Sequence, residues 1–200
     1  MTIKRPRIGV MGGTFDPIHN GHLVAASEVA DAFHLDEVIF VPTGEPWQKQ
    51  TITDSEHRYQ MTQLAIAGNE HFDISRVDVD RPGPTFTVDT LRDIAAEHPE
   101  AELFFITGAD SISQIGTWKD AEEIWELAHF VGVTRPGHSL QVPKSPHGAV
   151  SLLEIPALAI SSTDIRARVK AGKPIDYLLP EAVIDYIQQN NLYRSDQGTE

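Results

Sequence analysis

Gly12-Gly13-Thr14-Phe15-Asp16-Pro17-Ile18-His19-Asn20-Gly21-His22 is the stretch of this sequence that decides the fold. The apolar run at residues 8–11 precedes it and predicts a short buried strand, and the apolar spacing of residues 23–33 predicts a helix after it. Two glycines, an aspartate and two histidines therefore occupy a strand-to-helix turn. In α/β proteins such a turn lies at the carboxyl edge of the sheet, where ligands bind, and the N-terminus of the following helix attracts anions.

Strand-like and helix-like segments alternate along the rest of the chain. Strands are predicted at residues 37–41, 72–79, 103–107, 130–133 and 151–155, and helices at residues 54–66, 87–97, 121–127, 162–170 and 180–189. Residues 43–53 and 137–148 are polar and are predicted to be loops. The alternation predicts an α/β fold with a mostly parallel central sheet and helices on both of its faces.

Composition narrows the class of protein. The 200 residues suit one domain, expected over residues 1–194, with a disordered tail at residues 195–200. No segment is apolar and long enough to span a membrane, and no apolar signal region follows the basic N-terminus. The absence of cysteine excludes thiolate chemistry and fits a reducing cytoplasm. A net charge of −13 argues against nucleic-acid or anionic-membrane partners, but not against a small phosphorylated substrate.

The first turn suits a phosphate group. Its two glycines let the backbone approach a ligand closely, and Thr14 offers a hydroxyl. His19 and His22 are three positions apart, so both imidazoles can share one face of the first helical turn. We therefore expect a phosphate cradle. Two alternatives stay open, a zinc site that includes Asp16 and a plain glycine turn whose histidines only cap the helix.

A second stretch, Ile160-Ser161-Ser162-Thr163-Asp164-Ile165-Arg166, also suits an anion. Its hydroxyls can cap a helix, and Arg166 follows one turn later on the side of Ser162 and Thr163. The alternative is an ordinary capped helix that carries a surface arginine.

Four single residues are weaker candidates. Lys49 and Arg135 are cations in loops that follow strands, where isolated charges are usually solvated. Trp118 follows a glycine in a loop, where an indole can stack on a planar ring or lie partly in the core. Asp110 follows an apolar strand and can bind a ribose hydroxyl or cap the next helix.

The two stretches together resemble the paired signature of the nucleotidyltransferases with an HxGH motif. The remaining chain resembles one family of this group, the bacterial nicotinate-nucleotide adenylyltransferases. The segments that carry this resemblance are Gly83-Pro84-Thr85-Phe86-Thr87-Val88-Asp89-Thr90-Leu91, Gly108-Ala109-Asp110-Ser111, Thr117-Trp118, Val133-Thr134-Arg135-Pro136-Gly137, Leu178-Leu179-Pro180 and Asn191-Leu192-Tyr193. The resemblance covers nearly the whole chain.

The resemblance implies a Rossmann-like three-layer sandwich and a cytoplasmic enzyme of NAD biosynthesis. Its substrates would be ATP and nicotinate mononucleotide, and its cofactor Mg²⁺. The phosphate of the mononucleotide would attack the α-phosphorus of ATP in line, without a covalent enzyme intermediate, to give deamido-NAD and pyrophosphate. No partner other than small molecules is implied, and a homo-oligomer is left open.

The same resemblance assigns roles to residues. His19, His22 and Arg166 would be catalytic, with His22 on the α-phosphate and Arg166 on the β- and γ-phosphates. The ATP site would include Gly12, Gly13, Thr14, Phe15, Ile160, Ser161, Ser162 and Thr163. Substrate would also contact Lys49, Thr87, Asp110, Trp118 and Arg135: Trp118 would stack on the pyridine ring, Thr87 would help bind its carboxylate and Asp110 would bind ribose. No side chain is expected to hold a resident metal.

The chain departs from the family's common pattern after the second strand. Pro46-Trp47-Gln48-Lys49 stands where Pro-Pro-His-Lys or Pro-Pro-His-Arg is frequent, so only the cation is retained.

Two other functions are kept as alternatives. One is a phosphopantetheine adenylyltransferase, against which the insertion carrying Thr87 and Trp118 speaks. The other is a non-catalytic nucleotide-binding regulator, which would have lost the phosphate contacts that His19, His22 and Arg166 offer.

Overall fold

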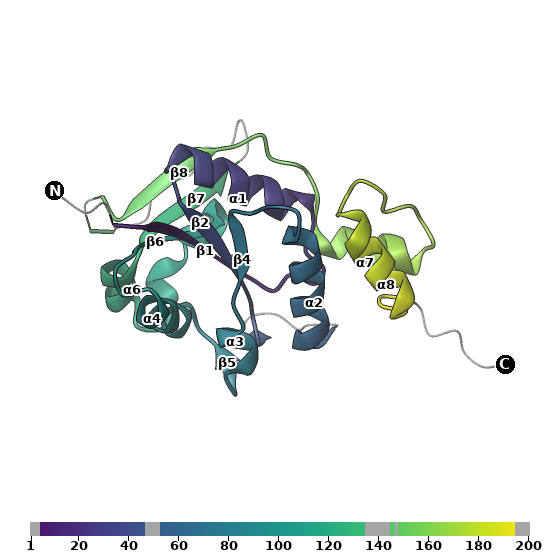
Figure 1. Ribbon diagram of the computed structural model, residues 1–200, viewed down its shortest axis with the longest axis horizontal. Coiled ribbons are helices and arrows are strands. Elements are labelled where there is room, and N and C mark those ends of the chain that lie inside the picture. Colours follow the sequence, from purple (N-terminus) through teal and green to yellow (C-terminus); the bar gives the residue numbers. More distant parts are fainter. Residues whose placement is uncertain (1–4, 47–52, 135–144, 147, 195–200) are drawn as a thin grey trace.

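A six-stranded sheet forms the centre of the computed structural model, which describes residues 5–46, 53–134, 145–146 and 148–194. The strands, in spatial order, are β4 (Phe72–Ile74), β2 (Glu37–Pro42), β1 (Arg7–Gly13), β6 (Glu102–Gly108), β7 (His129–Thr134) and β8 (Val150–Glu154). Every neighbouring pair is parallel. The chain starts in the middle of the sheet, builds to one edge and then returns to the other side of β1 (Figure 1). This order confirms the predicted Rossmann-like sheet, and its switch point lies between β1 and β6.

Side chains of successive strand residues enter two different cores. Val38, Phe40, Phe104 and Ile106 belong to one core, whereas Ile39, Val41, Leu103 and Phe105 belong to the other. Continuous apolar runs are what a parallel strand covered on both faces requires. They therefore explain why the central strands are apolar throughout.

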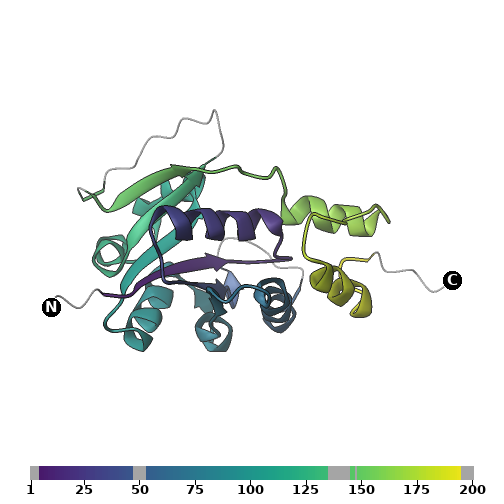
Figure 2. The same ribbon diagram turned by 45° about the horizontal axis from the view of Figure 1, so that its top comes forward.

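Helices complete the two outer layers. The first core includes residues of α1 (Asn20–Ala32), α2 (Ser55–Ile66), α7 (Ser162–Lys170) and α8 (Glu181–Gln189). The second includes residues of α4 (Thr87–Glu97), α5 (Ala109–Ile112) and α6 (Ala121–Leu127). Figure 2 shows α1, the purple helix, on one side of the sheet and the teal helix α4 on the other. Helix α8 packs on α2 at one end of the molecule.

The predicted strand at residues 72–79 is wrong beyond residue 74. Pairing with β2 ends there, and a short helix, α3 (Val77–Asp80), follows. The hydroxyl of Ser75 accepts a hydrogen bond from the Val77 N–H, and Arg76 pairs with Asp80 one turn later at 3.1 Å. Local polar contacts of this kind favour a helical turn over continued sheet pairing, although the alternation of side chains suggests a strand.

Short elements that the sequence does not indicate lie beside the sheet. β3 (Glu45–Pro46) and β5 (Pro84–Thr85) pair in parallel, and a 3₁₀ turn covers Ile115–Thr117. Gly44 precedes β3 at a crowded point, where a Cβ atom would lie 2.2 Å from the Asp78 carbonyl oxygen. Only glycine permits this approach, and the Gly44 N–H also donates to Thr85 Oγ1 in β5 at 3.1 Å.

Several predictions fall outside the part of the chain that the structure describes. They include the cations Lys49 and Arg135, most of the loop at residues 137–148 and the tail at residues 195–200. Organisation of residues 1–194 as one domain stays a prediction. Among the described helices, none has the length and apolar character that crossing a membrane requires.

Candidate functional site

Two cavities open at the carboxyl ends of β1 and β6, at the switch point of the sheet. The first has a volume of about 480 Å³ and the second about 620 Å³. They share six lining residues: Met11, His22, Thr107, Gly108, Ser162 and Thr163. The cavities are therefore two halves of one cleft, and His22 and Ser162 stand where they meet.

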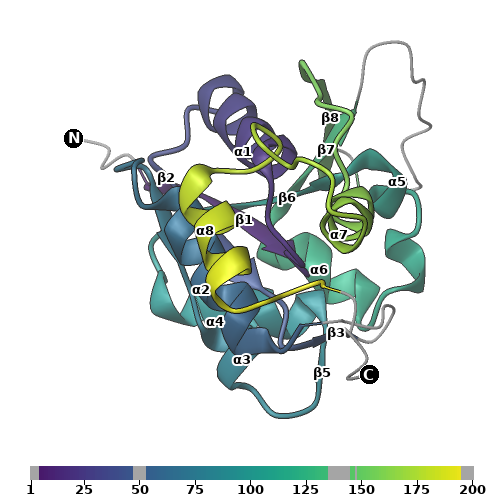
Figure 3. The same ribbon diagram turned by 90° about the vertical axis from the view of Figure 1, so that its right-hand side faces the viewer.

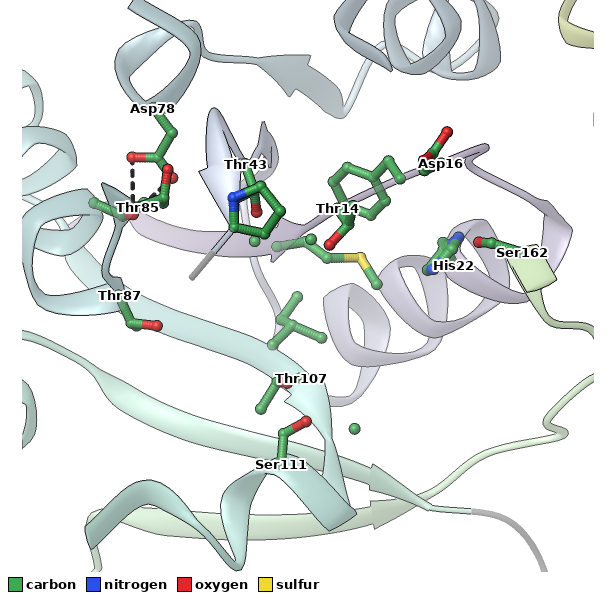
Figure 4. A pocket seen from close by; sticks show the side chains of 18 of the residues that line it. Thr14, Asp16, His22, Thr43, Asp78, Thr85, Thr87, Thr107, Ser111 and Ser162 are labelled. Atoms are coloured by element: carbon green, nitrogen blue, oxygen red, sulfur yellow. Dashed lines mark hydrogen bonds between the residues drawn. The ribbon is translucent and has the colours of Figure 1, made fainter. Parts of the chain in front are cut away.

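The first cavity continues from this junction toward α4. Figure 4 shows His22 and Ser162 on one side of it and Asp78, Thr85 and Thr87 on the other. Its walls are mostly small polar side chains and backbone. The remaining lining residues are Gly12, Gly13, Thr14, Phe15, Asp16, Thr43, Pro46, Thr90, Phe105, Ile106, Ser111, Trp118 and Arg166.

The second cavity continues on the other side of the junction, between α5, the end of β7 and the segment before α7. His19, Asp110 and Ile160 line it together with mostly apolar residues. Those are Gly21, Ala25, Ala109, Val133, Thr134, Ile155, Ala157, Leu158 and Ser161. A hollow whose wall combines apolar side chains with polar groups suits a planar base with its sugar.

His19 and His22 form a stacked pair whose ring centroids are 3.7 Å apart. The backbone N–H of His19 donates to Nδ1 of His22 at 3.1 Å. Because that nitrogen accepts a hydrogen bond, the proton of the neutral His22 ring is on Nε2. Phe15 meets the same ring edge-on, with centroids 5.1 Å apart. The backbone thus fixes both the tautomer and the orientation of His22.

His19 is the more buried member of the pair, with 6% of its surface exposed. Burial lowers its pKa to about 4, so the ring is neutral at pH 7. Its Nδ1 atom is buried and has no hydrogen-bond partner within the described chain. His19 is also the residue that caps the N-terminus of α1. It therefore supports His22 and borders the second cavity only.

The two sequence stretches meet directly. Ser162 Oγ donates to the Pro17 carbonyl oxygen at 2.8 Å, and Arg166 Nη1 donates to the Asp16 carbonyl oxygen at 2.8 Å. The Nη2 atom of Arg166 lies 3.4 Å from Thr163 Oγ1. Among the described residues that line the cleft, Arg166 is the one cation. The clasp therefore brings its positive charge to the first turn.

The two helix N-termini at the cleft differ in what they offer an anion. At the start of α1, the Asn20 N–H donates to the Leu178 carbonyl and the His22 N–H to the His19 carbonyl. At the start of α7, the Ser161 hydroxyl accepts only from the Asp164 N–H. The two preceding N–H groups, of Ser162 and Thr163, have no intrahelical acceptor by position. The α7 terminus is therefore the better-equipped anion site, whereas the sequence favours α1.

The Asp16 carboxylate accepts hydrogen bonds from other residues of the chain. Tyr193 donates to its Oδ1 at 2.6 Å, and the Thr53 N–H donates to its Oδ2 at 3.4 Å. In the described parts of the chain, no group of three or more His, Cys, Asp or Glu side chains is placed to hold a metal ion. Asp16 therefore braces the first turn through these hydrogen bonds.

Trp118 lines the first cavity from the loop after the 3₁₀ turn. Phe105 and Phe130 each contact its ring edge-on, with centroids 6.4 Å away. Lys119 donates to Asp89 in the first turn of α4 at 2.9 Å. The Trp118 ring is thus partly in the core and also lines the cleft, and its stacking on a planar ring stays a prediction.

Most of the predicted site residues lie around this one cleft. Those at the first cavity are Gly12, Gly13, Thr14, Phe15, Thr87, Trp118 and Arg166; those at the second are His19, Asp110, Ile160 and Ser161; His22, Ser162 and Thr163 line both. The Phe15 side chain is buried in the first core, so little of its surface is exposed to the cleft. Lys49 and Arg135 lie outside the described residues.

Sequence reasoning missed two kinds of residue. Thr43, Thr107 and Thr134 stand at the carboxyl ends of β2, β6 and β7, so the rule that ligands bind there can identify them. Asp78 has no such signal. It is a buried carboxylate bonded to Thr90 and Arg81, and burial raises its pKa.

Arg58 is a further residue without a sequence signal. It is 1% exposed, and within the described residues it donates to carbonyl oxygens alone, those of Thr14 at 2.9 Å, Gly44 at 2.7 Å, Thr43 and Thr53. Arginine has five N–H donors in a rigid fork, which allows it to satisfy several carbonyls at once. Arg58 thereby joins the first turn to both ends of the segment between β2 and α2.

The chain is similar to known proteins over most of its length. The chain matches the family described as cytidylyltransferase-like over residues 10–168. It is 68% identical to a protein of Clavibacter michiganensis subsp. michiganensis named "Probable nicotinate-nucleotide adenylyltransferase", over 96% of each chain. A protein of the same name from Streptomyces coelicolor is 62% identical, over 93% of this chain and 100% of the other.

Among solved structures, a nicotinic acid mononucleotide adenylyltransferase of Plasmodium falciparum complexed with NaAD has the same fold. Its TM-score is 0.76 at 24% identity, over 94% of this chain and 97% of the other.

Proposed function

The chain belongs to the nicotinate-nucleotide adenylyltransferase family, and from that premise we propose how its cleft performs the reaction. The enzyme transfers the adenylyl group of ATP to nicotinate mononucleotide in NAD biosynthesis, giving nicotinate adenine dinucleotide and pyrophosphate. One observation carries the mechanism: two cavities meet at His22. A reaction that joins two nucleotides needs two such sites and a shared point for the phosphate that is transferred.

ATP is assigned to the second cavity and the junction. Its adenine and ribose would lie between Ile160 and Asp110, which line that cavity from opposite segments. Its β- and γ-phosphates would lie at the N-terminus of α7, against Arg166 and the N–H groups of Ser162 and Thr163. A helix N-terminus and a guanidinium both stabilise negative charge on phosphate, and here they occur together.

Nicotinate mononucleotide is assigned to the first cavity. Trp118 would stack on the pyridine ring, because its indole is held at the cavity wall by Phe105 and Phe130. Thr87 would help bind the carboxylate, and Thr85 lies next to it on the same wall. Lys49 and Arg135 remain predicted phosphate contacts.

The chemical step is a direct displacement at the α-phosphorus. An oxygen of the mononucleotide phosphate forms a bond to that phosphorus while the bond to the bridging oxygen of the β-phosphate breaks, and pyrophosphate leaves. No proton has to move. Negative charge grows on the α-phosphate oxygens and on the leaving group, and the Nε2–H of His22 would donate to the former while Arg166 would stabilise the latter. His19, neutral and stacked beneath His22, would keep that donor in place.

Mg²⁺ is proposed to arrive with ATP. The Asp16 carboxylate is already bonded to Tyr193 and Thr53, and the described residues form no cluster of three metal ligands. These features suit an ion that keeps its waters and binds through substrate phosphates. When bound, the ion would neutralise phosphate charge. A cytoplasmic location, where ATP is supplied, belongs to the same proposal, and the oligomeric state is left open.

Initial rates of pyrophosphate release test the substrate assignment. With Mg²⁺ and ATP held constant, release should require a pyridine mononucleotide and should be faster with the nicotinate than with the nicotinamide form. Phosphopantetheine in place of either should give no release. Turnover with phosphopantetheine, or none with either mononucleotide, would refute the assignment.

A further inference from the structure

Tyr193 reaches the first turn from the opposite end of the described chain. It lies in the short segment after α8, which Figure 3 shows in yellow, and its hydroxyl donates to Asp16 Oδ1 at 2.6 Å across 177 positions of sequence. Asp16 is 4% exposed. Tyr193 lines neither cavity and is therefore not expected to touch a substrate.

The surroundings make this a strong hydrogen bond. The hydroxyl lies 4.0 Å from Sδ of Met61, a residue of the first core with no exposed surface, and the Tyr193 ring packs against that core. An O–H group that donates to a carboxylate at 2.6 Å, away from water, is charge-assisted. Burial and the Asp16 charge raise the pKa of Tyr193, so the hydroxyl keeps its proton.

The backbone of Tyr193 adopts a conformation that tyrosine rarely uses. Its φ angle is +61°, in the left-handed region that favours glycine. This region is sterically unfavourable for a residue with a Cβ atom. The Tyr193 side chain is held by packing against the first core, by the bond to Asp16 and by a side-chain hydrogen bond with Thr53.

Asp16 passes this constraint to the cleft. While its carboxylate accepts from Tyr193 and from the Thr53 N–H, its carbonyl oxygen holds Arg166 Nη1 at 2.8 Å. Asp16 therefore accepts a hydrogen bond from Tyr193 with its side chain and one from Arg166 with its backbone carbonyl. A shift of the Asp16 backbone would move the carbonyl oxygen to which Arg166 Nη1 donates.

We propose that Tyr193 is a positioning residue for adenylyl transfer, which fixes Asp16 and, through the Asp16 carbonyl, orients Arg166 at the leaving pyrophosphate. This inference rests on the proposed role of Arg166. It differs from a role in stability alone, because it predicts a loss of turnover that depends on Arg166.

The experiment compares Tyr193→Phe with Tyr186→Phe. The control removes a hydroxyl that is 2.8 Å from His57 Nδ1, between α8 and α2, and Tyr186 lines neither cavity. Both variants should show the circular dichroism spectrum of the wild type and are assayed well below their melting temperatures. We expect kcat to fall about tenfold in Tyr193→Phe with KM for nicotinate mononucleotide unchanged, and to stay at the wild-type value in Tyr186→Phe.

The same substitution in an Arg166→Ala background separates positioning from stability. If Tyr193 acts through Arg166, Tyr193→Phe should cause no further loss of kcat there. An equal loss in both backgrounds, or a wild-type kcat in Tyr193→Phe alone, overturns the inference. Lack of wild-type turnover with nicotinate mononucleotide would instead refute the proposed function, so the two failures are distinguishable.

Discussion

Arg166 Nη1 lies 2.8 Å from the carbonyl oxygen of Asp16, and this contact joins residues 150 positions apart. Ser162 makes a parallel contact with Pro17 at 2.8 Å. The two sequence stretches thus lie together in space, and the groups proposed to bind phosphate line the same cleft. Each side chain makes a different contact in this cleft, so a substitution at each should have a different effect.

Arg166→Lys should impair turnover although it keeps the charge. The guanidinium contacts the Asp16 carbonyl and Thr163 from separate nitrogens, and a lysine ammonium has no such fork. We expect kcat to fall about tenfold and KM for ATP to rise severalfold. Steady-state kinetics with varied ATP measures both values. Arg168→Lys, in the same helix but paired with Asp164 away from the cleft, is the matched control and should retain wild-type kinetics.

His22→Ala should reduce kcat far more than it weakens ATP binding. The Nε2–H of His22 is proposed to contact the α-phosphate most strongly in the transition state, and removal of one such donor costs about 10²–10³-fold in rate. Rapid-quench turnover and equilibrium binding of a non-hydrolysable ATP analogue give the two quantities. His71→Ala changes an exposed histidine just before β4, at the far end of the sheet, and should leave both unchanged. Equal losses of binding and rate in His22→Ala would contradict the assigned role.

Trp118→Leu should weaken binding of the pyridine nucleotide selectively. Loss of an aromatic stacking partner is expected to raise KM for nicotinate mononucleotide about tenfold, with KM for ATP nearly constant. Trp125→Leu is the comparison, because Trp125 also contacts Phe130 but belongs to the second core rather than the cleft. That variant should lower the melting temperature and leave both KM values in place. A shared loss of stability with no KM difference would make Trp118 a core residue only.

Stability should fall in mild acid because of His19. Its pKa is about 4 in the folded protein and near 6.5 when unfolded, so between these values the unfolded chain binds more protons. The contribution is complete above pH 6.5 and is lost as the pH falls toward 4, by up to roughly 3 kcal/mol. Urea unfolding at a series of pH values measures it. In His19→Gln this part of the pH dependence should disappear, whereas His71→Gln should keep it.

Arg58→Met should lower the stability of the protein more than most single substitutions outside the cleft. It leaves four carbonyl oxygens without their buried donor, which is expected to lower the free energy of unfolding by about 3 kcal/mol or more. Arg76→Met removes a surface arginine that pairs with Glu56 and Asp80, and should cost less than about 1 kcal/mol. Similar losses in both variants, measured by urea unfolding, would argue against the linking role of Arg58.

Periodicity was sufficient for elements whose apolar pattern agrees with their local polar contacts. The bounds of α4 and α6 are those predicted, because a helical apolar face and the flanking turns coincide there. It failed at residues 75–80, where alternation suggests a strand but Ser75 and Arg76 bond within the segment. No local pattern encodes the pairing of β3 with β5, which joins segments that are distant in sequence.

The candidate site divides in the same way. Residues proposed to carry the chemistry at strand ends and helix starts, such as His22 and Ser162, are recognisable from their motifs. Residues that hold those motifs in place are not, because their partners are distant in sequence and are often backbone atoms. Arg58 bonds only to carbonyls, and Tyr193 meets Asp16 from the far end of the chain. Such roles become visible only with the fold.

The contacts that Asp16 and Pro17 make with Ser162, Arg166 and Tyr193 also fix when activity can begin during synthesis. The ribosome makes the first turn early, but the arginine that completes the cleft follows 150 residues later and the tyrosine 177 residues later. A nascent chain in which β1 and α1 have been synthesised but α7 has not therefore lacks the arginine proposed for catalysis. A premature stop before α7 should therefore yield an inert fragment rather than a weak enzyme.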